Sequence, residues 1–348
     1  MSTDLSERIL WMRGEQERFL SVFMDQNNRC NLKCRMCGFS DPRARTVPAY
    51  DMPRALFASI AAQLFPRTSY LALSLMTEPF MTRDFPDRLH LVRDYGVPFS
   101  DIITNGLLLS ERSIAKIVEA EITRLTFSID GGTKELYEAI RIGAKFENVI
   151  RNVRLFRSMR GATLLRINHV LSQGNIDHFD VFLDLVEELG AETIEVRTIS
   201  PMGEAELRMT DDSAFWSKVG DARAKLAAFC ARTGIEDSGY LRDRAERIEL
   251  CDAHGVRMTC RRPWDTLAIH GNGDAYVCMA WDREPLGNFT RQTFEEMWSG
   301  AAMAALRAEF DEVEPGVDCL HCTIRTRSGS RSDGEFFHRK LAKPLPVT

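Results

Sequence analysis

The chain has 348 residues, of which 44% are apolar and 27% are charged, and its formal net charge is −5. This length allows one large domain and a smaller one, and the composition is that of an ordinary globular protein. The negative charge argues against nucleic acid or an anionic membrane as the main partner. No apolar run approaches the roughly 20 residues that a membrane-spanning helix needs, and residues 1–16 lack the pattern of a signal peptide.

These exclusions predict a cytoplasmic protein in a reducing compartment. The nine cysteines of the chain are then better explained as metal ligands or catalytic thiols than as disulfides. We find no internal repeat and no low-complexity segment.

From residue 21 to about residue 200, short apolar strands alternate with amphipathic helices. The expected strands cover residues 22–26, 70–75, 101–103, 125–129, 164–170 and 193–199. The expected helices cover residues 54–64, 85–95, 111–120, 134–140, 147–159 and 176–189. In the last helix, Asn175 is expected to cap the N-terminus and Gly190 to end the helix. Six alternations predict a parallel sheet covered by helices, either open or curled into a barrel.

Polar and apolar side chains alternate along three of these strands. Successive strand residues face opposite sides of a sheet, which groups Ser128 with Asp130, Arg166 with Asn168, and Glu195 with Arg197. The strand face that packs on helices must be apolar, so these polar groups should point inward near the carboxyl ends of the strands. Barrels and doubly wound sheets place their active sites there.

The pattern changes after Pro201. Residues 211–233 predict a long amphipathic helix, and the polar stretch 236–246 is expected to be a linker. A β-hairpin is predicted from strands 266–270 and 275–279 around a Gly-Asn-Gly-Asp turn. The basic tail beyond Cys322 is interpreted as a solvated segment.

Three cysteines lie close together directly after the first strand. Cys30, Cys34 and Cys37 occur in the sequence CNLKCRMC. Three thiolates can hold three irons of a cubane cluster and leave the fourth iron open for chemistry. A structural zinc site completed by a distant ligand, or a chance grouping of buried cysteines, is the alternative.

A CxxxCxxC motif at the end of the first strand of a (β/α) domain resembles the radical S-adenosylmethionine (SAM) superfamily. The resemblance implies a partial (β/α)6 TIM-like barrel and a [4Fe–4S] cluster that reductively cleaves SAM. The 5′-deoxyadenosyl radical formed in this way abstracts a hydrogen atom from a substrate. A reducing partner such as flavodoxin or ferredoxin is also implied.

Further segments carry the resemblance along the chain. Met76-Thr77-Glu78-Pro79 stands where the family has Gly-Gly-Glu-Pro, although both glycines are missing here; residues 104–106 and 128–131 match its TNG and SIDG segments. The family resemblance implies SAM contacts at Glu78, Thr104, Asn105, Ser128, Arg141 and Asn168. Within this set, Ser128 and Arg141 would bind the SAM carboxylate, since a guanidinium grips a carboxylate through two hydrogen bonds. Strand parity alone makes Asp130, Glu195 and Arg197 candidates for contacts to SAM or substrate.

A second group of cysteines lies in the C-terminal part of the chain, at Cys260, Cys278, Cys319 and Cys322. Four thiolates can saturate a structural zinc or a [4Fe–4S] cluster, and the residue types do not separate the two. GDAYVC followed by a later CxxC resembles the SPASM/Twitch domains. No cysteine follows Cys322, so the resemblance implies the shorter Twitch type with one auxiliary [4Fe–4S] cluster.

The resemblance divides the chain into three parts: a radical SAM core at 1–240, a SPASM/Twitch-like domain at 241–330 and the basic tail at 331–348. It favours oxidation of a small-molecule substrate such as a sugar, aminocyclitol or nucleotide sugar. Only about 24 residues precede the first cysteine-bearing strand, which is too few for the leader-binding domain of many peptide modifiers. Peptide modification, epimerisation with Cys251 as a hydrogen donor, and a zinc-stabilised structural protein stay open as alternatives.

Overall fold

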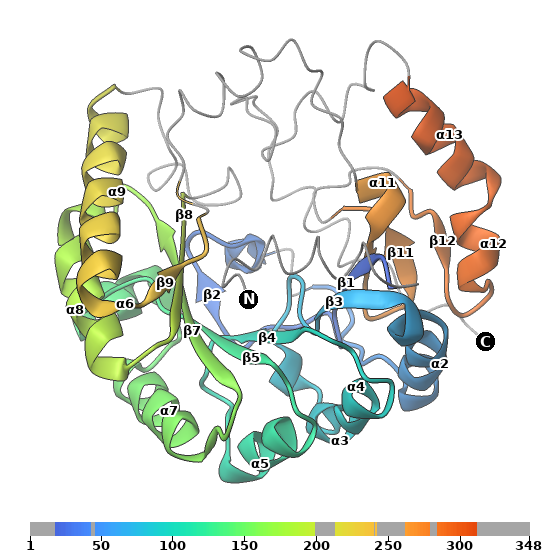
Figure 1. Ribbon diagram of the computed structural model, residues 1–348, viewed down its shortest axis with the longest axis horizontal. Coiled ribbons are helices and arrows are strands. Elements are labelled where there is room, and N and C mark those ends of the chain that lie inside the picture. The colour runs from blue at the N-terminus through green and yellow to red at the C-terminus, as the bar shows by residue number, and fades with distance from the viewer. Residues whose placement is uncertain are drawn as a thin grey trace.

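A computed structural model describes residues 18–42, 46–198, 213–239, 241, 262–278 and 284–311. Its centre is one ten-stranded sheet of order β12-β11-β10-β1-β3-β4-β5-β7-β8-β9. The sheet is strongly curved, and helices α2, α5, α7 and α8 follow one another along its outer side (Figure 1). The predicted parallel sheet with helices outside is therefore confirmed, in the curled form.

Eight strands of this sheet run in the same direction: β1 (Leu20–Met24), β3 (Thr68–Ala72), β4 (Ser100–Thr104), β5 (Arg124–Ser128), β7 (Leu164–Leu171), β8 (Thr193–Thr198), β9 (Glu236–Asp237) and β10 (Thr266–Ile269). All six predicted strands occur within two or three residues of their expected bounds. The displacement of the first strand, by two residues, carries meaning. β1 ends at Met24, so Asp25 and Gln26 leave the strand and begin the loop to the cysteines.

The described helices are α2 (Arg54–Leu64), α3 (Phe85–Arg88), α4 (His90–Asp94), α5 (Glu111–Glu119), α6 (Lys134–Ile140), α7 (Phe146–Met159), α8 (Phe179–Leu189), α9 (Ser213–Thr233), α11 (Arg262–Asp265), α12 (Phe294–Trp298) and α13 (Ala301–Asp311). The predicted helix 85–95 is split at Leu89 into α3 and α4. Within the described ranges, no helix combines the length and the apolar character that crossing a membrane requires.

The start of the helix before β8 differs from the prediction. Asn175 precedes a 3-10 turn, Ile176–His178, and its side chain caps neither that turn nor α8. Instead the Asn175 amide donates to the carbonyls of Asp130 and Val170, at 3.0 and 2.9 Å, and so joins the ends of β5 and β7. Gly190 does end α8, with a left-handed φ of 65° that favours glycine.

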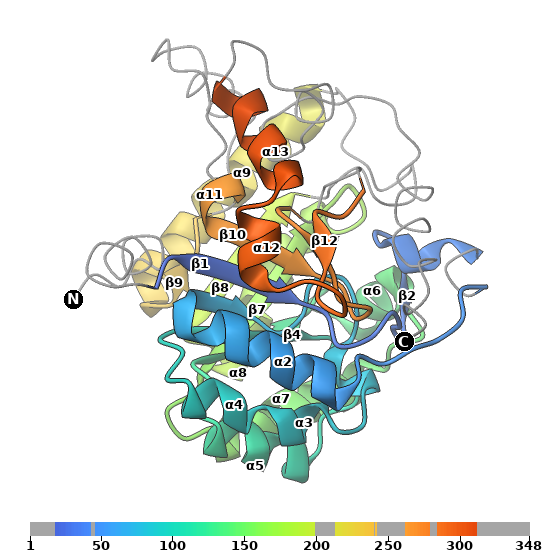
Figure 2. The same ribbon diagram turned by 90° about the vertical axis from the view of Figure 1, so that its right-hand side faces the viewer.

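The predicted hairpin is confirmed, and it lies in an unexpected place. β10 pairs antiparallel with β11 (Asp274–Tyr276), which pairs with β12 (Gly287–Asn288). β10 also pairs in parallel with β1, with Ser21 opposite Thr266, so the hairpin extends the main sheet. Figure 2 shows α12 beside α2, where the Phe294 amide donates to Gln63 at 2.8 Å.

Gly271, in the hairpin turn, lies against the loop that leads from β1 to the cysteines. A Cβ atom at Gly271 would stand 2.9 Å from the backbone nitrogen of Asn27 and 3.0 Å from its Cα. Backbone atoms cannot move aside as a flexible side chain can. Only glycine therefore allows this close approach.

Gly271→Ala is expected to lower the free energy of unfolding by about 1–3 kcal/mol, since the added methyl group overpacks this contact. Urea unfolding of the full chain measures the change. Gly220→Ala is the matched control, because Gly220 lies on an exposed face of α9 with nothing within 4 Å. The control should be neutral or stabilising by about 0.5–1 kcal/mol. Equal effects of the two substitutions would contradict the proposed contact.

Candidate functional site

The three clustered cysteines lie in the loop between β1 and α2. A two-residue strand, β2 (Lys33–Cys34), pairs antiparallel with β6 (Arg141–Ile142), and the register sets Cys34 opposite Arg141. The Arg35 amide also donates to the Ile140 carbonyl at 2.9 Å. This small sheet holds the cysteine loop against the end of α6, although more than 100 residues separate them in the chain.

Two of the three sulfurs accept hydrogen bonds from residues that the family resemblance places at SAM. The side-chain amide of Asn105 donates to Cys30 Sγ, and the Arg141 guanidinium donates to Cys34 Sγ, each at 3.9 Å. Burial raises the pKa of all three thiols, to about 12 for Cys34. They are therefore neutral thiols until a cation binds, and metal binding deprotonates thiols outright.

No group of three or more His, Cys, Asp or Glu side chains in the described ranges is gathered closely enough to hold a single metal ion. A cubane cluster makes a different demand, because each thiolate binds its own iron and the sulfurs need not converge on one point. Soft thiolates also suit iron–sulfur clusters. The residues present therefore fit such a cluster through Cys30, Cys34 and Cys37.

Asp25, the first residue after β1, organises the loop that follows β3. Its buried carboxylate accepts hydrogen bonds from the amides of Leu75, Met76 and Thr77 at 3.0–3.1 Å, and from the Thr77 hydroxyl at 2.8 Å. Three successive amides that converge on one anion form a nest. The donors of this segment are thus occupied, which leaves acceptor groups for an incoming ligand.

This arrangement explains how the segment can lack the two glycines of the family motif. In the described part of the chain, Glu121 is the one residue other than glycine with a positive φ. Met76 and Thr77 thus have backbone angles that any residue adopts without strain. The hydroxyl of Thr77 also supplies a hydrogen bond to Asp25 that glycine could not.

Glu78 follows directly and lies buried next to Cys30. Its carboxylate accepts hydrogen bonds from the Thr104 hydroxyl and from the backbone amide of Asn105, each at 2.8 Å. Burial raises the pKa of Glu78 to about 7, although these hydrogen bonds oppose the rise. The structure thus brings together Glu78, Thr104 and Asn105, three of the residues assigned to SAM by resemblance, around a carboxyl group that is readily ionised by a bound cation.

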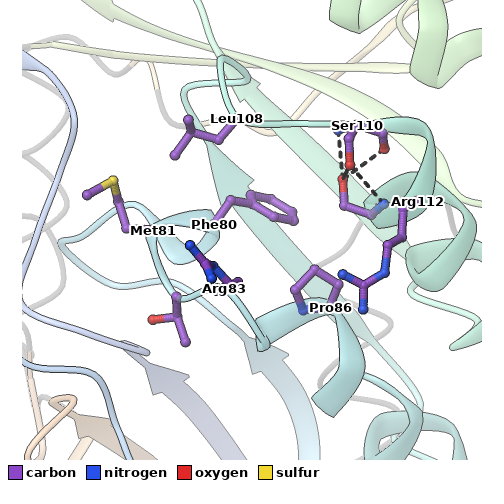
Figure 3. Close-up of a pocket in the computed structure, with 9 residues that line it drawn as sticks. Phe80, Met81, Arg83, Pro86, Leu108, Ser110 and Arg112 are labelled. Atoms are coloured by element: carbon purple, nitrogen blue, oxygen red, sulfur yellow. Dashed lines mark hydrogen bonds between the residues drawn. The ribbon is translucent and has the colours of Figure 1, made fainter.

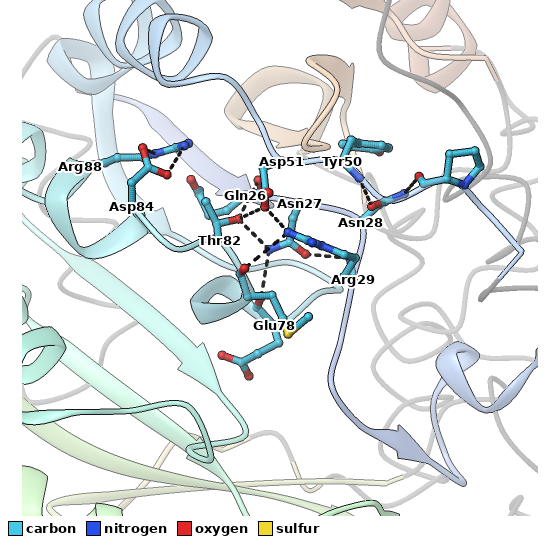
Figure 4. A network of polar contacts seen from close by, with 12 residues as sticks. Gln26, Asn27, Asn28, Arg29, Tyr50, Asp51, Glu78, Thr82, Asp84 and Arg88 are labelled. Carbon is cyan, nitrogen blue, oxygen red and sulfur yellow. Dashed lines mark hydrogen bonds and ion pairs between the residues drawn. The ribbon is translucent and has the colours of Figure 1, made fainter.

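Figure 4 shows the hydrogen-bond network that holds the backbone of Glu78 in place. The Asn27 side chain donates to the Glu78 carbonyl and to the Thr82 hydroxyl, each at 3.0 Å. The Thr82 hydroxyl in turn donates to Asp51 at 2.7 Å, and Arg29 pairs with the same carboxylate. Because Asn27 also touches Gly271, this network connects the hairpin to the Glu78 loop.

Asp130 and Arg141 form a buried ion pair beside Cys34. Asp130 accepts from Arg141 Nε at 2.6 Å and from the Val170 amide at 2.7 Å. Although burial opposes the charge of Arg141, Asp130 raises the pKa of the guanidinium above its ordinary value. Both oxygens of Asp130 are engaged within the protein. Its geometry is that of a residue that positions Arg141 rather than one that contacts a ligand.

Three polar residues form a row across neighbouring strands, with Ser128 opposite Asn168 and Asn168 opposite Glu195. The buried oxygen Asn168 Oδ1 has no hydrogen-bond partner in the described part of the protein. An unpaired buried oxygen calls for an explanation, and a ligand hydroxyl group would supply one. The predicted inward face of these strands is therefore where the structure offers unused polar groups.

Below this row lies a charged cluster around Asp101 and Arg124, two residues that the sequence analysis did not single out. Asp101 accepts from Arg124 and Arg166, each at 2.8 Å, and from Thr126 at 2.7 Å. Although burial works to raise it, the two guanidiniums hold the pKa of Asp101 below its ordinary value. Arg166 continues to Glu195, which also pairs with Arg197. The side chain of Arg197 is 51% exposed, so the cluster reaches the open end of the sheet.

A pocket of about 250 Å³ lies outside this site, between the loop after Glu78 and the start of α5 (Figure 3). Phe80, Pro86 and Leu108 give this pocket apolar surface, and Arg83 and Arg112 give it charge. No cysteine and none of the predicted SAM contacts lines it. This pocket is therefore not the place of the predicted chemistry.

The structure gathers most of the predicted residues at one end of the sheet and leaves four cysteines unplaced. Cys278 ends the hairpin region and accepts a hydrogen bond from Arg262 at 3.2 Å. Cys251, Cys260, Cys319 and Cys322 lie outside the described residues. Sequence reasoning missed Asp25, although it is a polar residue at the carboxyl end of a buried strand, the same signal that identified Asp130.

Two family profiles match this sequence. The radical SAM superfamily profile covers residues 26–194, and that of an iron–sulfur cluster-binding domain, SPASM, covers residues 260–323. The two matched segments contain all seven cysteines assigned above to metal binding.

Curated relatives are distant. A probable GTP 3′,8-cyclase of Methanococcus maripaludis is 24% identical over 183 residues, which cover 52% of this chain and 58% of the cyclase. The aligned region is thus little more than half of that enzyme. An AdoMet-dependent heme synthase of Methanosarcina barkeri is 25% identical over 294 residues, covering 78% of this chain and 80% of the synthase.

Solved structures share the fold. Streptococcus suis SuiB bound to precursor peptide SuiA superposes with a TM-score of 0.68 at 15% identity, covering 91% of this chain and 72% of SuiB. Native anSMEcpe with bound AdoMet has a TM-score of 0.64 at 18% identity, covering 87% of both chains. At these identities the similarity concerns the fold alone.

Asp25→Ala is expected to lower the free energy of unfolding by about 2–5 kcal/mol, because it leaves several buried amide groups without an acceptor. Urea unfolding of the metal-free chain measures this loss. Asp94→Ala, which removes an exposed carboxylate paired with Arg93, should change the same quantity by less than about 0.5 kcal/mol. An unchanged midpoint and slope for Asp25→Ala would show that the carboxylate does not hold the 75–77 segment.

Proposed function

Because this chain carries a radical SAM domain followed by an iron–sulfur cluster-binding SPASM domain, we propose that it oxidises a small polar substrate through a radical mechanism. The observation that carries the proposal is the joining of Cys34 to Arg141 and of Cys30 to Asn105 and Glu78 at one end of the sheet. A [4Fe–4S] cluster bound there together with SAM supplies a 5′-deoxyadenosyl radical that abstracts a hydrogen atom.

Different residues of the chain would bind different groups of SAM. Glu78 would accept from the amino group, because its segment presents acceptors and its carboxyl group ionises near neutral pH. Arg141, already charged and held by Asp130, would bind the carboxylate. Ser128 would meet the carboxylate together with Arg141, and Asn168, its neighbour in register, would accept from a ribose hydroxyl through its unused buried oxygen.

The polar interior supports the choice of substrate class. Arg166, Glu195 and Arg197 connect the buried cluster to the open end of the sheet. Such a surface offers fixed charges and hydrogen bonds to hydroxyl, amino or phosphate groups, as in a sugar, an aminocyclitol or a nucleotide sugar. In the oxidation, the substrate would lose one hydrogen atom to the radical, one proton to a base or solvent, and one electron to the auxiliary cluster. Cys260, Cys278, Cys319 and Cys322 would hold that cluster.

Anaerobic reconstitution tests the proposal. The full chain should bind about eight irons and form 5′-deoxyadenosine after addition of SAM and dithionite. The Cys30/Cys34/Cys37→Ala triple variant should keep about four irons and form none. Cys230→Ala, on α9, is the control and should match the wild type. Zinc in place of iron, with no deoxyadenosine formed, would leave a structural metalloprotein.

The substrate class has its own test. Panels of sugars, aminocyclitols and nucleotide sugars, and in parallel synthetic peptides, are incubated with the reconstituted enzyme and limiting SAM. A polar small molecule that raises deoxyadenosine formation and loses two mass units supports oxidation. Turnover of a peptide alone would place the chain among peptide modifiers. Retained mass with inverted stereochemistry would indicate epimerisation.

SAM affinity should rise with pH through neutrality. Below about pH 7 Glu78 is protonated, and its proton must leave before the carboxylate can accept a hydrogen bond from the amino group of SAM. The dissociation constant should therefore fall up to about tenfold per pH unit between about pH 6 and 7, and level off above. Equilibrium dialysis measures it. Glu78→Gln should bind more weakly and show a flat profile, and a steep profile in that variant would assign the titration elsewhere.

The same shift acts on stability with the opposite sign. Because the pKa of Glu78 is raised in the folded chain, its favourable contribution is complete below its ordinary value of 4.5 and is lost as pH rises through about 7. Glu78→Gln should therefore stabilise the SAM-free chain more at pH 8 than at pH 5.

A further inference from the structure

The hydroxyl group of Tyr137 is a buried polar group that the site described above does not use. Tyr137 lies on α6 and is fully buried, with 0% of its surface exposed. Its hydroxyl has no hydrogen-bond partner within the described part of the protein. A buried hydroxyl group without a partner is unfavourable for folding. Phenylalanine would fill the same space without that penalty, so the hydroxyl indicates a partner that the described residues do not provide.

The fold fixes the position of this side chain closely. Gly131 allows the chain after β5 to pass directly under α6, since a Cβ there would stand 2.7 Å from the backbone nitrogen of Tyr137. The Tyr137 ring packs against Phe146 with 5.5 Å between the ring centroids. Thr133 caps α6 through a hydrogen bond to the Leu136 amide. Both the backbone and the ring of Tyr137 are thus fixed by their neighbours.

The surroundings of the hydroxyl are those of the Arg141 site. Arg141 follows Tyr137 by four residues and is the residue at which α6 ends. Burial raises the pKa of Tyr137, and the neighbouring charge that acts on it most strongly is that of Arg141, followed by that of Asp130. The hydroxyl is therefore a protonated donor at neutral pH, close to the guanidinium.

The acceptor groups near the Tyr137 hydroxyl are engaged by other donors. Asp130 is engaged by Arg141 and the Val170 amide, and Cys34 Sγ accepts from Arg141. An acceptor that arrives next to a buried, charged guanidinium is most favourably an anion. A hydroxyl donor next to a guanidinium matches the two oxygens of a carboxylate, because each oxygen then accepts a hydrogen bond.

We propose that the Tyr137 hydroxyl donates a hydrogen bond to the carboxylate of bound SAM, beside Arg141, and is a SAM-binding residue. The inference rests on the proposed function, since it needs SAM at this site. It adds a residue outside the sequence segments that resemble the family. It also gives a reason for an unpaired polar atom in the core of the domain.

The test compares Tyr137→Phe with wild type in the full, reconstituted chain. The dissociation constant for SAM should rise about tenfold. The decarboxylated analogue of SAM should bind the variant and the wild type equally, because it lacks the acceptor. Without cluster or SAM, urea unfolding of the variant should show equal or greater stability than wild type.

Tyr70→Phe is the matched control. The hydroxyl of Tyr70 donates to Asp101 Oδ2 at 3.4 Å, in the charged cluster with Arg124 and Arg166. This substitution should leave SAM affinity unchanged. Three results would overturn the inference: equal SAM affinity of Tyr137→Phe and wild type, an equal loss with the analogue, or a shifted cluster reduction potential before SAM is added. The last would mean that the hydroxyl meets a cluster sulfur. Failure of the wild type to bind SAM would instead contradict the proposed function.

Discussion

The buried carboxylate of Asp25 is the interaction on which the arrangement of the site depends. At the carboxyl end of a parallel sheet, the amides of the next loop must find acceptors, because water is excluded. Asp25 supplies one acceptor for three of them and for a hydroxyl group. Its own amide donates to the Ile269 carbonyl at 2.9 Å. One residue thus joins β1, the Glu78 loop and β10.

The charges in this interior are arranged for binding at the expense of stability. Taking an ion pair out of water costs free energy that its own attraction offsets only in part. Asp130 with Arg141, and Asp101 with Arg124 and Arg166, are nevertheless nearly or fully buried. A purely structural barrel would fill these positions with branched apolar side chains. The polar layer is what the proposed binding of a polar ligand requires, with Arg141 kept charged and oriented by Asp130.

Local patterns in the sequence predicted the elements well, whereas contacts between distant segments were not accessible. Helix α2 and the strands through β8 follow from apolar periodicity, and the hairpin follows from its Gly-Asn-Gly-Asp turn. The pairing of β10 with β1 depends on a register between segments about 245 residues apart, which no local pattern encodes. The opposition of Cys34 and Arg141 is of the same kind.

The candidate site shows the same division. Motifs located Glu78, Asn105, Ser128 and Arg141 because each lies at a strand or helix end with a recognisable neighbour. Asn175 was assigned to the wrong partners, since an amide before a helix can bond backward to two strand ends as readily as forward to the helix. Tyr137 carries no motif. Its unpaired hydroxyl becomes visible only when the packing around α6 is known.

The position of β1 between β3 and β10 has a consequence for how the chain is made. A ribosome releases β1 early, but the strand that covers its second edge is β10, synthesised nearly 250 residues later. Until then the unpaired edge of β1 is open to other chains. The hairpin is therefore the last part of the sheet to be made, and the profile boundary at residue 260 does not mark a unit that can be removed without exposing that edge of β1.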